Sequence, residues 1–336
     1  NRVWTVKLKP GFTFSNGEPV TSDNYLKAWN YGAYGPNAQL ASYFFSRIDG
    51  FADLQSIDPD KDGPKKAPAP KATKMSGLKK VNDTTFTVTL TSGFAGWQSV
   101  MGYDAFYPLP DAAFSSDGVL KKEFGEAPIG NGPFKMKGTW KHDEQIQVEK
   151  VADFKGTVPK VDGINWKIYQ ELSAQYADLT AGNLDVETKI PLENLAQAAG
   201  DLGDRLLRTE SSGFSFLGFP FFDKDYQNPD VRRALSMAIN RAEITEQIFL
   251  GSERPATSFI PKVVAGSRPN SCGEFCEYNP TRARQLYTAA NGPKTVKITY
   301  NIDGGHKPWV DATCNQIKAS LGVNCVGQGE AKFADL

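Results

Sequence analysis

The stretch NPDVRRALSMAINRAEITEQIFLG, residues 228–251, carries the firmest local signals in the chain. Asn228 is a good helix cap, and Pro229 suits the first helical position, where its missing N–H costs nothing. Apolar residues then recur at three- and four-residue spacing: Val231, Ala234, Leu235, Ala238 and Ile239. This pattern predicts a helix that buries one face.

A second helix is predicted immediately afterwards. Asn240 followed by Glu243 has the spacing of a helix cap and its reciprocal partner. Ile244 and Ile248 continue the apolar face, and Gly251 stands where a helix-ending glycine is expected. Taken as a pattern alone, the stretch predicts a helix pair of a kind found in many globular proteins.

Composition sets the limits for the whole chain. Its 336 residues are enough for roughly two domains, and 40% apolar with 12% aromatic residues allow a sizeable core. The formal net charge is zero, so the basic face typical of nucleic-acid binding is not expected. No apolar run reaches the roughly 18 residues that a membrane helix needs.

The four cysteines fall into two local pairs, Cys272 with Cys276 and Cys314 with Cys325. An even number in local pairs favours disulfides and an oxidising compartment. Four cysteines allow three connectivities, and only proximity in sequence favours this one. A zinc site is a poor match, because these spacings lack the tight ligand pairs that zinc sites use.

A loop rich in proline and lysine contains half of a calcium motif. Asp58, Asp60 and Asp62, followed by Gly63, match the first six positions of a calcium-binding loop. The twelfth position, which should be a bidentate glutamate, is Ala69. A solvated loop is therefore the better interpretation, and the sequence predicts neither a metal nor a cofactor.

Several stretches together resemble one family. They are VRRALSMAINRAEI at 231–244 with FLGSERPATSFIP at 249–261, GFTFSNGEPVT at 11–21, FYPLP at 106–110 and PIGNGPF at 128–134. They resemble the extracellular solute-binding proteins of peptide ABC importers, family 5, which includes oligopeptide- and dipeptide-binding proteins. The resemblance covers essentially the whole chain.

This resemblance implies an α/β fold of the type II periplasmic-binding-protein kind. Such a fold has several lobes with mixed sheets, a hinge and a ligand cleft between lobes. It implies a small inserted domain at 1–127, part of the hinge-bearing lobe at 128–218 and the first part of the large C-terminal lobe at 219–336. Family members are longer at both ends, so we expect a fragment whose partners include the remainder of its own chain.

The resemblance also implies a function. It predicts the substrate-binding component of an ABC importer, which captures oligopeptides outside the membrane and delivers them to a membrane permease. The hinge would close over an extended peptide, backbone groups would pair with the peptide main chain, and water-filled pockets would accept varied side chains. The chain is not expected to be an enzyme or to bind nucleic acid.

Candidate ligand-binding residues follow from the same resemblance. They are Tyr43, Tyr103, Asp104, Phe106, Phe214 and Phe216. Packing in the core is the competing interpretation for the aromatic ones. In particular, the apolar run 213–222 predicts a strand buried on both faces. The acidic residue that pairs with the peptide amino group in the oligopeptide-binding members would lie beyond Leu336.

Other functions were weighed on the same residues. The cargo could be a dipeptide, a nickel chelate or an oligosaccharide, or the protein could be a surface receptor that senses peptides. A secreted hydrolase would need a nucleophile–base or carboxylate pair, and no motif supplies one. The predicted location is extracytoplasmic, either periplasmic or as a cell-surface lipoprotein whose lipid anchor would lie upstream of Asn1.

Overall fold

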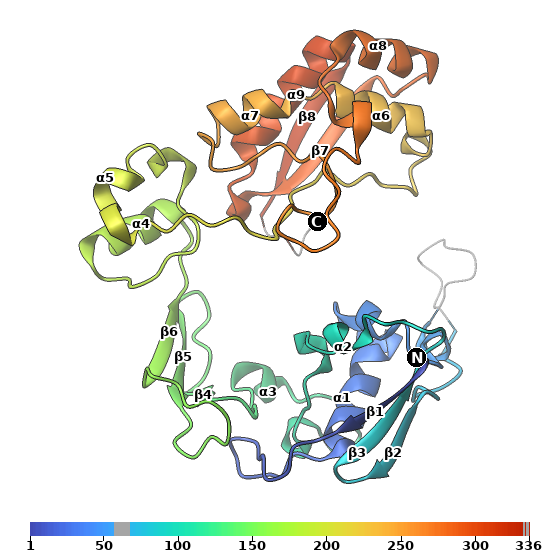
Figure 1. Ribbon diagram of the computed structural model, residues 1–336, viewed down its shortest axis with the longest axis vertical. Helices are drawn as coiled ribbons and strands as arrows, with labels where there is room; N and C mark the ends of the chain where they lie inside the picture. The colour runs from blue at the N-terminus through green and yellow to red at the C-terminus, as the bar shows by residue number, and fades with distance from the viewer. Residues whose placement is uncertain (57–67, 332, 334–335) are drawn as a thin grey trace. The chain divides into compact units, whose positions relative to one another are not determined.

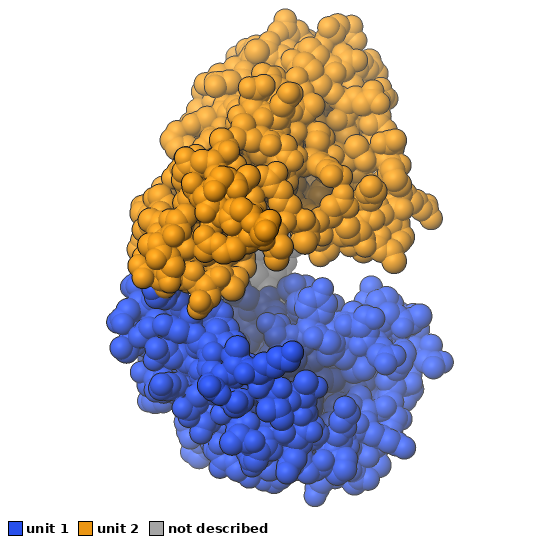
Figure 2. Space-filling view, turned by 60° about the vertical axis from the view of Figure 1, so that its left-hand side comes forward, with its two compact units in different colours: residues 1–168 blue, residues 169–336 orange. Residues whose placement is uncertain are grey.

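The computed structural model describes residues 1–56, 68–331, 333 and 336 (Figure 1). The chain divides into two compact units, which Figure 2 shows in blue and orange: unit 1, residues 1–168, and unit 2, residues 169–336. The calcium-like motif at 58–63 lies outside the described residues. The division into three parts at 127 and 218 stays a prediction.

Unit 1 begins with a three-stranded antiparallel sheet in the order β1-β3-β2, formed by β1 (Val3–Lys7), β2 (Leu78–Asn82) and β3 (Thr85–Thr89). Phe86 and Val88 of β3 are fully buried, as their alternation predicts. Helix α1 (Ser22–Ala33) packs against β2 and buries Trp29 in the same core.

Local sequence signals set the start of α1. Gly17 turns the chain with a φ of 90°, which is open to glycine at little cost. At the helix start, the Thr21 backbone N–H donates to Asn24 Oδ1 over 2.7 Å.

The remaining elements of this part of unit 1 are short. The 3-10 turns are η1 (Gly35–Asn37), η2 (Ser42–Phe45), η3 (Phe51–Leu54), η4 (Asp104–Phe106) and η5 (Asp111–Ala113). The short helices are α2 (Trp97–Val100) and α3 (Lys122–Glu126).

A second antiparallel sheet completes unit 1, in the order β4-β5-β6. Its strands are β4 (Phe134–Met136), β5 (Gln145–Lys150) and β6 (Gly163–Lys167). Every residue of β6 is exposed, including the apolar Ile164 and Trp166. This sheet therefore has an edge strand that nothing in unit 1 covers among the described residues.

Unit 2 begins with a small helical core. Helix α4 (Leu172–Ala181) ends at Gly182, whose φ of 81° is the left-handed conformation of a helix-ending glycine. Tyr176 and Leu179 of α4 pack against α5 (Ala198–Leu202). The 3-10 turns η6 (Leu192–Asn194) and η7 (Gly203–Arg205) flank α5.

The remainder of unit 2 is built around a parallel pair of strands, β7 (Thr295–Asn301) and β8 (Asn324–Glu330), connected by α9 (Lys307–Leu321). In Figure 1, α6 (Pro229–Met237), α7 (Arg241–Gln247) and α8 (Pro280–Ala289) gather beside this β-α-β unit, and their apolar faces share its core. The remaining 3-10 turns are η8 (Lys224–Tyr226), η9 (Gly273–Cys276) and η10 (Ile302–Gly304).

The helix pair predicted from 228–251 is confirmed as α6 and α7. Asn228 Oδ1 accepts the Asp230 N–H at 2.9 Å, and Asn240 Oδ1 accepts the Glu243 N–H at 3.2 Å. The predicted apolar stripe is the buried face of α6, and Ile244 continues it in α7.

The predicted buried strand at 213–222 is wrong. The segment has no regular secondary structure, and Phe216 is 70% exposed. Pro220 lacks the N–H that a strand ladder requires, and Gly218 adds no side chain to a core. A continuous apolar run therefore does not establish burial here.

Candidate functional site

Three aromatic rings form a stack at the surface of unit 1, which we call the tyrosine ladder: Tyr43, Phe44 and Tyr103. The Phe44 ring centroid lies 4.5 Å from that of Tyr43 and 4.5 Å from that of Tyr103. Tyr43 is 65% exposed and Tyr103 is 54% exposed, whereas Phe44 is half-buried. The fold thus brings together two predicted site residues that are far apart in sequence.

The tyrosine ladder packs against the buried aromatic core of unit 1. Phe44 contacts Phe106 edge-to-face at 6.3 Å, and Phe106 in turn lies 5.0 Å from Trp29. The indole Nε1 of Trp29 donates to the Phe106 carbonyl oxygen over 2.9 Å, which fixes the backbone of η4. Such a support holds the exposed rings in place before any ligand arrives.

Phe106 was predicted to contact ligand, but its side chain is only 2% exposed. It lies beneath the ladder as part of the core and supports the exposed rings. Its hydrophobic burial beside Trp29 and Trp97 accounts for this position.

Asp104 directly follows Tyr103 and begins η4 with an exposed side chain. Its carbonyl oxygen accepts the Tyr107 N–H at 2.9 Å, so the backbone around it is ordered. Within the described part of unit 1, no ion pair involves its carboxylate. Asp104 therefore adds an uncompensated negative charge next to Tyr103.

Unit 2 carries its own exposed aromatic group, the phenylalanine cluster: Phe214, Phe216 and Phe259. The Phe214 ring centroid lies 6.0 Å from Phe216 and 5.7 Å from Phe259. Phe216 and Phe259 are largely exposed. Sequence reasoning missed Phe259, although it lies within the family-like stretch 249–261.

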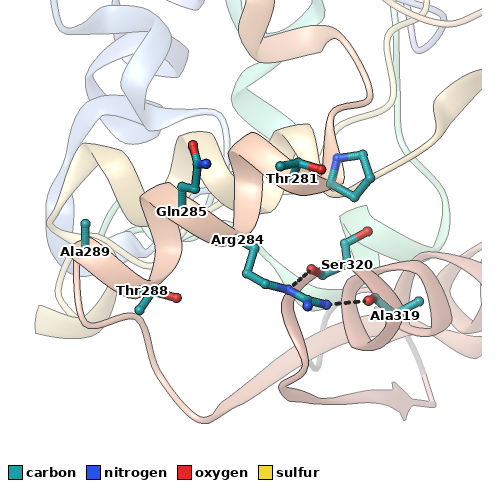
Figure 3. A pocket seen from close by; sticks show the side chains of 8 residues that line it. Thr281, Arg284, Gln285, Thr288, Ala289, Ala319 and Ser320 are labelled. Atoms are coloured by element: carbon teal, nitrogen blue, oxygen red, sulfur yellow. Dashed lines mark hydrogen bonds between the residues drawn. The ribbon is translucent and has the colours of Figure 1, made fainter.

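The surface depressions among the described residues include two in unit 2, and neither of these contains a predicted site residue. Figure 3 shows the first, where Arg284 of α8 donates from Nε to the Ser320 carbonyl and from Nη2 to the Ala319 carbonyl, over 2.9 and 3.0 Å. Both carbonyls belong to the last turn of α9, so Arg284 supplies donors to this helix end. The second depression lies over α4, η6 and α5, next to Tyr176 and Asn194.

Titratable groups around α4 act as hydrogen-bond partners. The Tyr169 hydroxyl donates to Asp178 over 2.6 Å, and this bond raises the pKa of Tyr169 to about 12. Burial, together with a 2.8 Å hydrogen bond to Asp201, raises the pKa of Tyr176 to about 12. Both phenols therefore remain protonated donors at neutral pH, which suits a structural role better than that of a general base.

The cysteines pair in the structure as Cys272–Cys276 and Cys314–Cys325, with Cα atoms 5.6 and 5.0 Å apart. The second bond joins α9 to β8 inside the core of unit 2. Among the side chains that the structure describes, histidine, cysteine and acidic residues form no group that could hold a metal. Across the described residues, none of the helices is long and apolar enough to cross a bilayer.

The chain is similar in sequence and in fold to several known proteins. A dipeptide-binding protein of Bacillus subtilis, DppE, is 26% identical over 96% of this chain and 59% of its own length. The murein tripeptide-binding protein MppA of Escherichia coli superposes with a TM-score of 0.80 at 23% identity, over 98% of this chain and 64% of its own. Haemophilus influenzae OppA, solved with the peptide RPPGFSPFR, gives a TM-score of 0.74 at 22% identity and the same coverage.

The fold is therefore that of a type II periplasmic binding protein, as predicted. Residues 1–325 match the model of the family described as bacterial extracellular solute-binding proteins, family 5 Middle, and the chain belongs to this family. The chain spans about three fifths of the length of the relatives it matches.

Proposed function

We propose that the protein is the substrate-binding component of an ABC importer that captures oligopeptides. Membership of the solute-binding family supports this proposal, as do the similar proteins named for binding dipeptides and a murein tripeptide. The peptide held by the Haemophilus influenzae protein points to the same class of cargo. The ligand would be released unchanged to a membrane permease, so no catalysis is proposed.

The observation that carries the proposal is the tyrosine ladder. A contiguous group of exposed apolar rings often marks a binding surface, and here Phe44 connects the two exposed tyrosines to the buried core. Tyrosine offers both an apolar face and a hydroxyl, which suits a peptide that presents carbon chains beside polar backbone groups. We place Tyr43 and Tyr103 in contact with the peptide.

The phenylalanine cluster of unit 2 would supply further apolar contacts through Phe214 and Phe216. Its exposed rings can pack on peptide side chains of different shape without fixing their identity. A narrower cargo, a dipeptide, is the second candidate, because the Bacillus subtilis relative is named for dipeptide binding.

We place the protein outside the cytoplasmic membrane, in the periplasm or at the cell surface through a lipid anchor. The family is described as extracellular, and the two disulfides of unit 2 favour an oxidising compartment.

Small molecules that copurify with the full-length natural protein provide the first test. The protein would be denatured, and the released compounds identified by mass spectrometry. Peptides of mixed sequence are expected. A single dipeptide would instead support the narrower cargo. Cleavage or other alteration of a peptide during incubation with the protein would contradict both candidate functions.

Titration calorimetry with a tripeptide then tests the site. Tyr43→Ala and Tyr103→Ala should each weaken binding about fivefold, since the loss of one aromatic contact costs about 1 kcal/mol. Tyr278→Ala is the matched control, because Tyr278 is an exposed tyrosine outside both aromatic groups. Equal affinities for all three variants would contradict the proposed site.

A further inference from the structure

We propose that the tyrosine ladder together with Asp104 is a subsite for a cationic peptide side chain, with arginine preferred over lysine. This inference rests on the proposed function and deepens it, because it names the class of side chain that this surface selects. The proposal combines three observations: exposed ring faces, a carboxylate adjacent in sequence, and no ion pair of that carboxylate with any residue that the structure describes.

The ring faces provide the first attraction. The face of an aromatic ring carries partial negative charge, and a cation within about 6 Å of the ring centre is attracted to it. Tyr43 and Tyr103 are each more than half exposed, and the Phe44 ring contacts both of them. Two tyrosine rings are therefore open to a cation without any rearrangement of the core.

The carboxylate of Asp104 provides the second attraction. Its Cα lies one peptide unit, about 3.8 Å, from that of Tyr103. Some acidic side chains of unit 1 have a basic partner: Asp49 pairs with Arg2 at 2.8 Å, and Asp111 pairs with Lys27 at 3.1 Å. In the described part of the unit, Asp104 has no such partner, so its charge is available to a ligand.

Unit 1 already contains contacts of the proposed kind. The Lys27 ammonium lies 4.4 Å from the Phe114 ring centroid, and the Arg47 guanidinium lies 4.3 Å from that of Phe94. Both cations are thus engaged within the fold. Arginine should be preferred in the ligand because its planar guanidinium can stack on a ring and donate to a carboxylate at once.

Calorimetry on the full-length protein with matched tripeptides tests this inference. A single guest residue, arginine, lysine, norleucine or glutamate, replaces each alanine of trialanine in turn. At one position the arginine peptide is expected to bind about tenfold more tightly than the norleucine peptide, which has a similar carbon chain without charge. The lysine peptide should fall between them, and the glutamate peptide should bind most weakly.

Variants then test whether Asp104 and Tyr103 cause the preference for the arginine peptide. Asp104→Asn should reduce the advantage of arginine over norleucine several-fold while the norleucine peptide keeps its affinity. Tyr103→Leu should also reduce this advantage, because an aliphatic side chain cannot make the cation–π contact. Asp53→Asn, which changes an exposed acid in η3, should leave the advantage intact.

The outcomes separate the two proposals. If all neutral and charged peptides bind equally well, the cationic subsite is overturned while peptide capture stands. If Asp104→Asn and Asp53→Asn behave alike, the subsite is also overturned. If no peptide binds at all, the proposed function fails and the subsite fails with it.

Discussion

At the scale of the residue, the Glu187 carboxylate is expected to lower the free energy of unfolding of unit 2. Both of its carboxylate oxygens are buried and have no hydrogen-bond partner among the described residues. Burial raises the pKa of Glu187, because water no longer stabilises the charged form. Nothing in the local sequence marks this residue, since glutamates in such segments are usually exposed.

The pH dependence of stability follows from that shift. The folded protein holds the Glu187 proton more tightly than the unfolded chain does, so the free energy of unfolding falls as pH rises through the raised pKa. Glu187→Gln removes this titration and should stabilise the protein at neutral pH, because the amide is similar in size but carries no charge that burial would penalise. Urea unfolding at pH 4 and pH 7.5 measures the effect.

The exposed neighbour Glu193 provides the control for this prediction. Glu193→Gln should change stability little at either pH, because its carboxylate is already in water. An equal gain for both variants, or a larger gain for Glu187→Gln at pH 4 than at pH 7.5, would contradict the argument.

At the scale of the element, three helices of unit 2 begin with an asparagine cap. Asn228, Asn240 and Asn279 each accept a backbone N–H from the first turn of their helix. Asn279 does more than this, because its own N–H donates to the Met237 carbonyl at the end of α6 over 2.9 Å. One residue therefore begins α8 and connects it to α6.

Replacing Asn279 tests the cap. Asn279→Ala keeps the backbone bond to Met237 but loses the Oδ1 acceptor for the Arg282 N–H, so it should cost about 1 kcal/mol of unfolding free energy. Asn279→Asp retains an acceptor and should cost much less. The urea midpoint for unit 2, followed by hydrogen exchange in α8, separates the variants, and equal losses would show that the cap contributes little.

The caps, the helix pair and the alternating strand β3 could be predicted because their signals lie within a few residues of sequence. The exposed ladder could be predicted only in part. Phe44 and Phe106 both belong to aromatic-rich segments, and only the packing around Trp29 decides that Phe106 is buried. The run 213–222 failed as a predicted strand because burial depends on partners that the run itself does not contain.

At the scale of the molecule, covalent cross-links are confined to one unit. All four cysteines lie beyond residue 168, and the Cys314–Cys325 bond lies in the core formed by α9, β7 and β8. In a chain-entropy description, a closed loop of this length stabilises the folded state by about 3 kcal/mol.

The double variant Cys314→Ala/Cys325→Ala should therefore lower the stability of unit 2 by about 3 kcal/mol. Hydrogen exchange should show the loss of protection in α9, β7 and β8, with unit 1 unchanged. Cys272→Ala/Cys276→Ala should cost less, because that bond closes a shorter loop outside the buried core. A uniform loss across residues 1–336 would contradict the confinement of this effect to unit 2.

The separations of 4 and 11 residues within the two cysteine pairs also bear on how the protein is made. If the polypeptide is translocated from its N-terminus into an oxidising compartment, each disulfide can form as soon as its second cysteine has crossed the membrane. Neighbouring thiols meet far more often than distant ones, so scrambled isomers should be rare during synthesis. Correct oxidation would then need little help from a disulfide isomerase.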